Sequence, residues 1–138
     1  MDVLFLIGRV LFVVLFVWSG LLNHFRRGGI EYARAYNAPA PDVLVPLSGA
    51  AIVLGSAMVV LGVFADLGAL ILIAFLIPVS YFMHAYWKET DPQQRTGQQV
   101  NFLKNIGLIG GALVIFYTYN QLQDQAGASL TDPLFGRG

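Results

Sequence analysis

Two histidines, one lysine and one asparagine are the side chains best suited to chemistry in this sequence. His24 follows the first long apolar stretch and His84 lies near the end of the third, while Lys104 and Asn105 open the fourth. Imidazole titrates near neutral pH and exchanges protons with bound groups, and ammonium and amide groups donate hydrogen bonds. If helices bring these four residues together, we expect them to hold a quinone carbonyl or to relay protons.

The same two histidines raise the alternative of haem. Histidines on different helices can bind one haem iron if they face each other across the ring, which sequence spacing does not establish. Histidine and lysine at a membrane surface also commonly reach for lipid head groups. We therefore favour quinone over haem as a ligand, and we predict no metal site and no catalytic residue.

Arg9 lies inside the first apolar stretch, roughly 9 Å along a helix that rises 1.5 Å per residue. Ionisable residues within a bilayer are costly and mark functional sites. One prediction is a structural contact with Asp66 or with the hydroxyl groups of residues 117–119. The other is a cationic site for a lipid head group or another anionic ligand. In either case Arg9 belongs to the opposite side of the membrane from His24 and His84.

The composition indicates a chain dissolved in lipid. Apolar residues make up 57% of the 138 residues and charged residues 12%, against roughly 45–50% and about 25% in ordinary soluble domains. Eight basic residues balance eight acidic ones, so the chain offers no basic surface for nucleic acid. It contains no cysteine, which excludes thiolate nucleophiles and cysteine-bound zinc or iron–sulfur clusters from its own chemistry.

Four apolar stretches are each long enough to cross a bilayer as a helix. About 20 helical residues span a hydrocarbon core of about 30 Å, and a lone strand there would leave its backbone groups unpaired. We predict an all-α polytopic membrane protein with one four-transmembrane-helix bundle over residues 1–120. The predicted helices cover residues 3–22, 43–64, 67–87 and 102–120.

Polar segments join or follow the predicted helices. Loop one (residues 23–42) and loop three (residues 88–101) each have room for a short interfacial helix. In loop three, Asp91-Pro92 has the pattern of a helix N-cap followed by proline. Residues 121–138 are predicted to be a polar, flexible tail.

The positive charges favour one orientation in the membrane. Five of them lie in loops one and three: Arg26, Arg27, Arg34, Lys88 and Arg95. The positive-inside rule puts those loops in the cytoplasm and both termini outside.

Small residues four positions apart occur twice, as Ala51 and Gly55 and as Gly107 and Gly111. Such pairs let helix backbones approach closely in lipid. They indicate packing within the bundle or, in the alternative, a homodimer face.

Several short motifs resemble the DoxX family of small bacterial and archaeal membrane proteins. An arginine stands early in the first helix at Arg9, and residues 19–25 (SGLLNHF) are similar to the family's SGxxH/KF pattern. The proline-containing stretch 36–41 (YNAPAP) is similar to the family's entry into its second helix. His84, a polar loop and residues 102–111 (FLKNIGLIGG) resemble its FxKNxxLxGG segment.

The resemblance implies a four-helix fold and, more loosely, a function. Relatives include a subunit of a thiosulfate:quinone oxidoreductase and members linked to membrane redox-stress complexes. The implied role is a subunit or accessory component of a quinone-linked redox or oxidative-stress system in the bacterial inner membrane. Such a component works with redox protein partners and has no stand-alone activity. The alternative is a non-catalytic assembly, chaperone-like or lipid-binding protein, and a channel ranks last because few polar side chains could line a pore.

Overall fold

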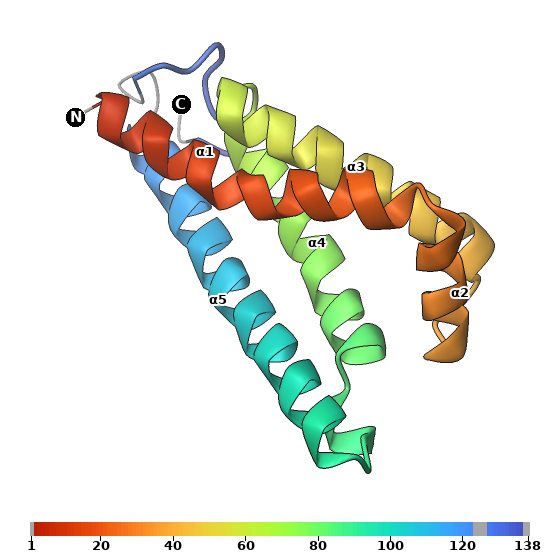
Figure 1. Cartoon of the computed structure of the whole chain (residues 1–138). Coiled ribbons are helices and arrows are strands. Elements are labelled where there is room, and N and C mark those ends of the chain that lie inside the picture. Colours follow the sequence, from red (N-terminus) through yellow and green to blue (C-terminus); the bar gives the residue numbers. More distant parts are fainter. Residues whose placement is uncertain (1, 123–126, 137–138) are drawn as a thin grey trace.

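The computed structural model describes residues 2–122 and 127–136. The elements are α1 (Asp2–Ser19), the π-helical turn η1 (Gly20–His24), α2 (Arg27–Ala35), α3 (Pro41–Leu61), α4 (Ala65–Met83), the 3-10 turn η2 (Tyr86–Lys88) and α5 (Pro92–Leu122), as Figure 1 shows. Four of the described helices are long and apolar enough to cross a membrane: α1 with η1, α3, α4 with η2, and α5. The predicted all-α four-helix membrane fold is confirmed.

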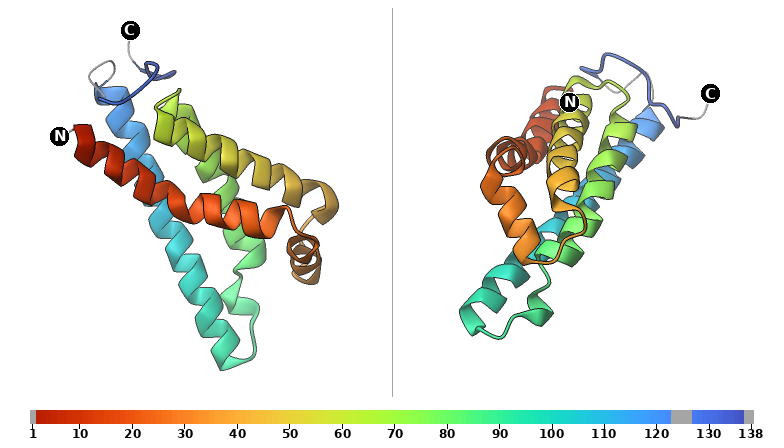
Figure 2. Two further views of the ribbon diagram at one scale, coloured as in Figure 1. Left: turned by 45° about the horizontal axis from the view of Figure 1, so that its top comes forward. Right: turned by 90° about the vertical axis from the view of Figure 1, so that its right-hand side faces the viewer.

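The bundle has two ends that carry different parts of the chain. We call one the termini end, where the start of α1, the α3–α4 turn, the end of α5 and residues 127–136 lie (Figures 1 and 2). The other is the loop end, which holds η1, α2 and the connection from α4 to α5. Helix α3 packs against α4, α4 against α5, and α1 against α3. Toward the loop end, α1 and α3 diverge from α4 and α5 (Figure 1).

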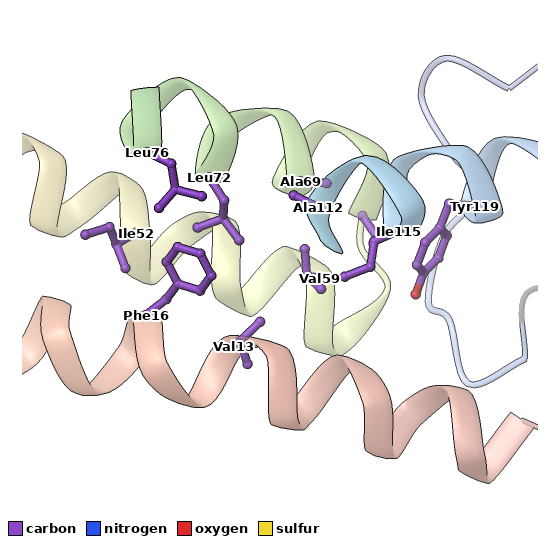
Figure 3. Packing of buried hydrophobic residues seen from close by; sticks show 11 residues of the cluster. Val13, Phe16, Ile52, Val59, Ala69, Leu72, Leu76, Ala112, Ile115 and Tyr119 are labelled. Carbon is purple, nitrogen blue, oxygen red and sulfur yellow. The ribbon is translucent and has the colours of Figure 1, made fainter. Parts of the chain in front are cut away.

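Apolar side chains from all four long helices fill the middle of the bundle (Figure 3). Phe16 of α1 points between Ile52 of α3 and Leu72 of α4, and all three are buried. Large apolar side chains also cover the outside, as at Val114, which is 64% exposed. An apolar exterior over an apolar core requires lipid as the surrounding solvent, so the bundle is in contact with the bilayer.

The tight hairpin of α3 and α4 depends on small residues. A Cβ atom at Gly55 would lie 3.0 Å from the carbonyl oxygen of Gly68, so the two backbones pack directly together there. Gly55, half of one predicted small-residue pair, thus serves packing within the bundle. On α5, Gly111 packs against Phe12, whereas a Cβ at Gly107 meets nothing within 4 Å in the described structure. The homodimer face stays a prediction.

Helix α5 begins earlier than the sequence predicts, at Pro92 rather than at residue 102. Asp91 caps it as expected, because the backbone N–H of Gln94 donates to Asp91 Oδ2 at 2.9 Å. No proline interrupts the chain between this cap and the apolar stretch, so one helix of 31 residues forms. The prediction of a separate short helix in loop three is therefore wrong, because these residues form the start of α5. Helix α2 is the short helix predicted in loop one.

Part of the predicted tail lies against the termini end. The backbone N–H groups of Leu130 and Thr131 donate to the carbonyl of Gly62 at 3.1 and 3.0 Å, and the N–H of Phe64 donates to Thr131 Oγ1 at 2.8 Å. Residues 123–126 and 137–138 of that tail lie outside the described residues. The flexibility of the tail stays a prediction.

Candidate ligand-binding site

A cavity of about 530 Å³ lies at the loop end, lined by residues of all five α-helices and of η1. It brings together four of the five predicted site residues: His24, His84, Lys104 and Asn105. Apolar side chains of α1 and α4 form much of the remaining wall. A volume of this size is typical of small-molecule sites, which combine an apolar lining with a few polar groups.

His24 lines the cavity at the point where α1 ends in a π-helical turn. The wider turn of η1 rotates the residues that follow Ser19 away from the positions they would have in a regular α-helix. Nδ1 of His24 lies 3.3 Å from the carbonyl oxygen of Ser19, and the ring packs edge-on against Phe75 with 5.5 Å between centroids. Gly49 of α3 makes room for this turn, since a Cβ there would lie 2.6 Å from the Cβ of His24.

His84 directly follows α4 and belongs to a hydrogen-bond network across the loop end. Its Nδ1 lies 2.8 Å from Oε1 of Gln98 on α5. The Nε2 amide group of Gln98 donates to the hydroxyls of Tyr32 and Tyr36 at 2.8 and 2.9 Å. The Tyr36 hydroxyl in turn donates to Glu89 Oε1 at 3.2 Å. The network joins α2, α5 and the α4–α5 connection, and so holds the imidazole of His84 in place.

Lys104 and Asn105 are neighbours on α5 that differ in their surroundings. Asn105 is buried and donates to Ser80 Oγ at 3.1 Å, while Ser80 donates to the Leu76 carbonyl at 2.6 Å. This pair of hydrogen bonds ties α5 to α4 beside the cavity. The exposed ammonium group of Lys104 lies 3.4 Å from Asn101 Oδ1, a long hydrogen bond that a ligand can replace.

A more apolar groove of about 370 Å³ adjoins the cavity between α3 and α4. Five side chains line both spaces: His24, Val45, Phe75, Val79 and Met83. His24 thus stands where a polar cavity meets an apolar groove. An amphiphile with a polar ring and an apolar chain matches this combination.

The polar groups of the cavity can bind a ligand by hydrogen bonds and can exchange protons. Imidazole, ammonium and amide groups line the cavity, and such groups can donate or accept hydrogen bonds. Within residues 2–122 and 127–136, no three His, Asp or Glu side chains come close enough to hold a metal ion.

Arg9, the fifth predicted site residue, lies at the termini end and does not line the cavity. Its side chain is 1% exposed. The guanidinium donates to the Tyr119 hydroxyl, to the Ala128 carbonyl at 3.0 Å and to the Val59 carbonyl at 3.5 Å. The rings of Phe5 and Tyr119 lie 5.1 and 5.6 Å from it, within the range of cation–π contacts.

Of the two structural contacts predicted for Arg9, the one with a hydroxyl group of residues 117–119 is present. Among the described residues, Arg9 and Asp66 form no ion pair. Asp66 instead accepts a hydrogen bond at 2.7 Å from the backbone N–H of Phe135. Residues 127–136 therefore cover both buried charges.

Gln98, Tyr32 and Tyr36 were not predicted as site residues. Gln98 lies in the segment predicted as loop three, and both tyrosines lie in the segment predicted as loop one. The missed signal is a spacing of seven along α5: Gln98, Asn105, Ala112 and Tyr119 are all buried. A seven-residue repeat keeps side chains on one helix face, so it extends the buried face back to Gln98.

The fold and the site define a small polytopic α-helical membrane protein with a polar cavity at one end of its bundle. The profile of the DoxX family matches residues 4–85, and the chain belongs to this family. It is 26% identical over 118 residues to the inner membrane protein YphA of Escherichia coli strain K12, a match that covers 85% of this chain and 84% of that protein. No solved structure matches the chain.

Proposed function

We propose that this protein binds a membrane quinone at the loop end and serves as a subunit or accessory component of a quinone-linked redox or oxidative-stress system. The observation that carries the proposal is the convergence of His24, His84, Lys104 and Asn105 on one cavity. Four donors and acceptors beside an apolar groove match a ring that carries oxygen atoms and a long apolar chain. Family membership is consistent with this role.

The chemistry assigned to the cavity is binding and proton exchange. Lys104 donates to a ring oxygen, and the histidines take up or release the protons that accompany quinone reduction or oxidation. The chain has no cysteine to carry electrons. A redox protein partner therefore exchanges electrons with the bound quinone.

The bacterial inner membrane is the proposed location, in line with the name of the relative YphA. The loop end faces the cytoplasm because loops one and three carry most of the positive charges outside the apolar stretches. Both termini then lie outside. This orientation puts the cavity near the cytoplasmic surface, where a soluble partner can reach it.

A second candidate function is lipid binding within a non-catalytic assembly or chaperone-like protein. The groove between α3 and α4 favours it, because an apolar groove accepts an acyl chain as readily as an isoprenoid chain. Lys104 would then contact the phosphate of a lipid head group.

Native mass spectrometry of the protein extracted gently from its own membranes separates the two candidates. We expect a bound mass equal to that of a membrane quinone, lost in His84→Ala and retained in the control Tyr117→Ala. Tyr117 is 65% exposed at the termini end and does not line the cavity. A bound phospholipid without quinone would support the second candidate, and a quinone equally retained by His84→Ala would place it outside the cavity.

A further inference from the structure

The hydrogen-bond network behind His84 has a direction that starts at Glu89. An ionised carboxylate accepts hydrogen bonds and donates none, so the Tyr36 hydroxyl is the donor in its 3.2 Å contact with Glu89. The hydroxyl has only one hydrogen. Its oxygen must therefore accept in the 2.9 Å contact with Gln98.

The state of Tyr36 supports this direction. Partial burial, with Tyr32 and Glu89 close by, raises the pKa of Tyr36 to about 12, so the phenol keeps its proton at neutral pH. The Tyr32 hydroxyl lies 2.8 Å from the same amide nitrogen of Gln98. Two tyrosine oxygens thus occupy both N–H groups of the Gln98 amide.

With its NH₂ group turned to the tyrosines, Gln98 presents its carbonyl oxygen to His84 at 2.8 Å. A carbonyl oxygen only accepts, so Nδ1 of His84 carries a hydrogen and donates it. In the neutral imidazole the other nitrogen, Nε2, is then a bare acceptor. Nε2 makes no hydrogen bond to the described residues, and the side chain lines the cavity.

The second histidine of the cavity is held in the same way. Nδ1 of His24 lies 3.3 Å from the backbone carbonyl oxygen of Ser19, which also can only accept. Neutral His24 therefore also keeps its hydrogen on Nδ1 and leaves Nε2 as an acceptor. Lys104 also lines the cavity, and its ammonium group is a donor.

We propose that the cavity selects a ligand whose ring carries hydroxyl groups, namely the hydroquinone form, over the oxidised quinone. This inference rests on the quinone site proposed above. A hydroxyl donates to a histidine Nε2 and still accepts from Lys104, whereas a quinone carbonyl only accepts and meets Nε2 lone pair to lone pair. Gln98, Tyr36 and Glu89 are the positioning residues, because they determine which nitrogen of His84 bears the hydrogen.

The tautomer of His84 is tested by ¹⁵N–¹H correlation spectra of the ring nitrogens, recorded in detergent micelles at pH 8. The chain has two histidines, so His24→Ala leaves the His84 signals alone in the spectrum. We expect a protonated Nδ1 and a bare Nε2. Protonation at Nε2 instead would overturn the inference, whatever the protein binds.

The selectivity is tested by binding a decyl-substituted benzoquinone and its hydroquinone to the full chain, without oxygen, at the same pH. We expect the hydroquinone to bind roughly threefold to tenfold more tightly, the ratio that one ordinary hydrogen bond produces. Gln98→Leu should abolish the preference, whereas Gln98→Glu, whose carboxylate still accepts from Nδ1, should retain it. Equal affinities in the wild-type protein would overturn this inference alone, and no binding of either compound would refute the proposed function as well.

Discussion

Replacing Tyr119 with phenylalanine removes the hydroxyl group that accepts a hydrogen bond from Arg9. Both side chains are 1% exposed, so water has no access to replace the lost acceptor. The same hydroxyl accepts a hydrogen bond from Ser129 Oγ at 3.1 Å, which also loses its partner. Phenylalanine keeps the ring that packs in the core and faces the guanidinium. The substitution therefore isolates the contribution of one hydroxyl group.

We expect Tyr119→Phe to lower the free energy of unfolding by about 1.5–3 kcal/mol, the usual contribution of a hydrogen bond to a charged group. The carbonyl groups of Val59 and Ala128 remain as acceptors for Arg9, which keeps the loss below that of a fully unpaired buried charge. Titration of SDS into detergent micelles, followed by circular dichroism, measures this free energy.

Tyr117→Phe is the matched control for this experiment. Tyr117 lies two residues away on the same helix, is 65% exposed and makes no hydrogen bond within the described residues. We expect its change to stay within about 0.5 kcal/mol. Similar losses in the two variants, or a loss below about 0.5 kcal/mol for Tyr119→Phe, would refute the claim that Tyr119 holds Arg9.

Two further predictions concern packing and orientation. Gly49→Ala should destabilise the fold by about 1–3 kcal/mol, because the new Cβ would lie 2.6 Å from the Cβ of His24. Gly107→Ala should be neutral or stabilising by up to about 1 kcal/mol in the same SDS titration. An equal loss of stability in Gly49→Ala and Gly107→Ala would contradict the close packing of Gly49 against His24. Single cysteines in this cysteine-free chain report the orientation through an impermeant maleimide: Gln93→Cys should react only from the cytoplasmic side and Asp132→Cys only from outside. The reverse pattern would invert the proposed topology.

The sequence predicts the helices well because lipid leaves the backbone few choices. A segment of about 20 apolar residues must pair its own N–H and C=O groups, and a helix does so within one segment. The start of α5 was missed because hydropathy reports which residues enter the apolar layer, not where a helix begins. Residues from Pro92 onward are polar, yet the cap at Asp91 starts the helix there.

Part of the cavity lining could be predicted from the sequence. His24, His84, Lys104 and Asn105 stand out as polar groups at the edges of apolar stretches, and the fold brings them to one cavity. Gln98 was missed because a glutamine in a polar segment carries no such contrast. Its burial arises from contacts with α2, which lies more than 60 residues away in the sequence.

The docking of residues 127–136 was beyond sequence reasoning for a similar reason. Several of its hydrogen bonds use backbone N–H groups, as at Leu130 and Phe135, and these leave no mark on side-chain type. The sequence therefore predicts a polar segment but not the surface on which it lies.

Binding of a quinone at the loop end is tested most directly by the fluorescence of Trp18, which lines the cavity. The chain has two tryptophans, so Trp87→Phe leaves Trp18 as the sole emitter. We expect a decyl-substituted hydroquinone, kept reduced without oxygen, to quench Trp18 with saturation. His84→Ala should weaken that binding roughly tenfold, because the hydroquinone hydroxyl loses its hydrogen bond to Nε2 of His84. The reciprocal Trp18→Phe protein, which reports from Trp87, should show only weak quenching without saturation. Quenching that rises linearly in both proteins and ignores His84→Ala would contradict a quinone site in this cavity.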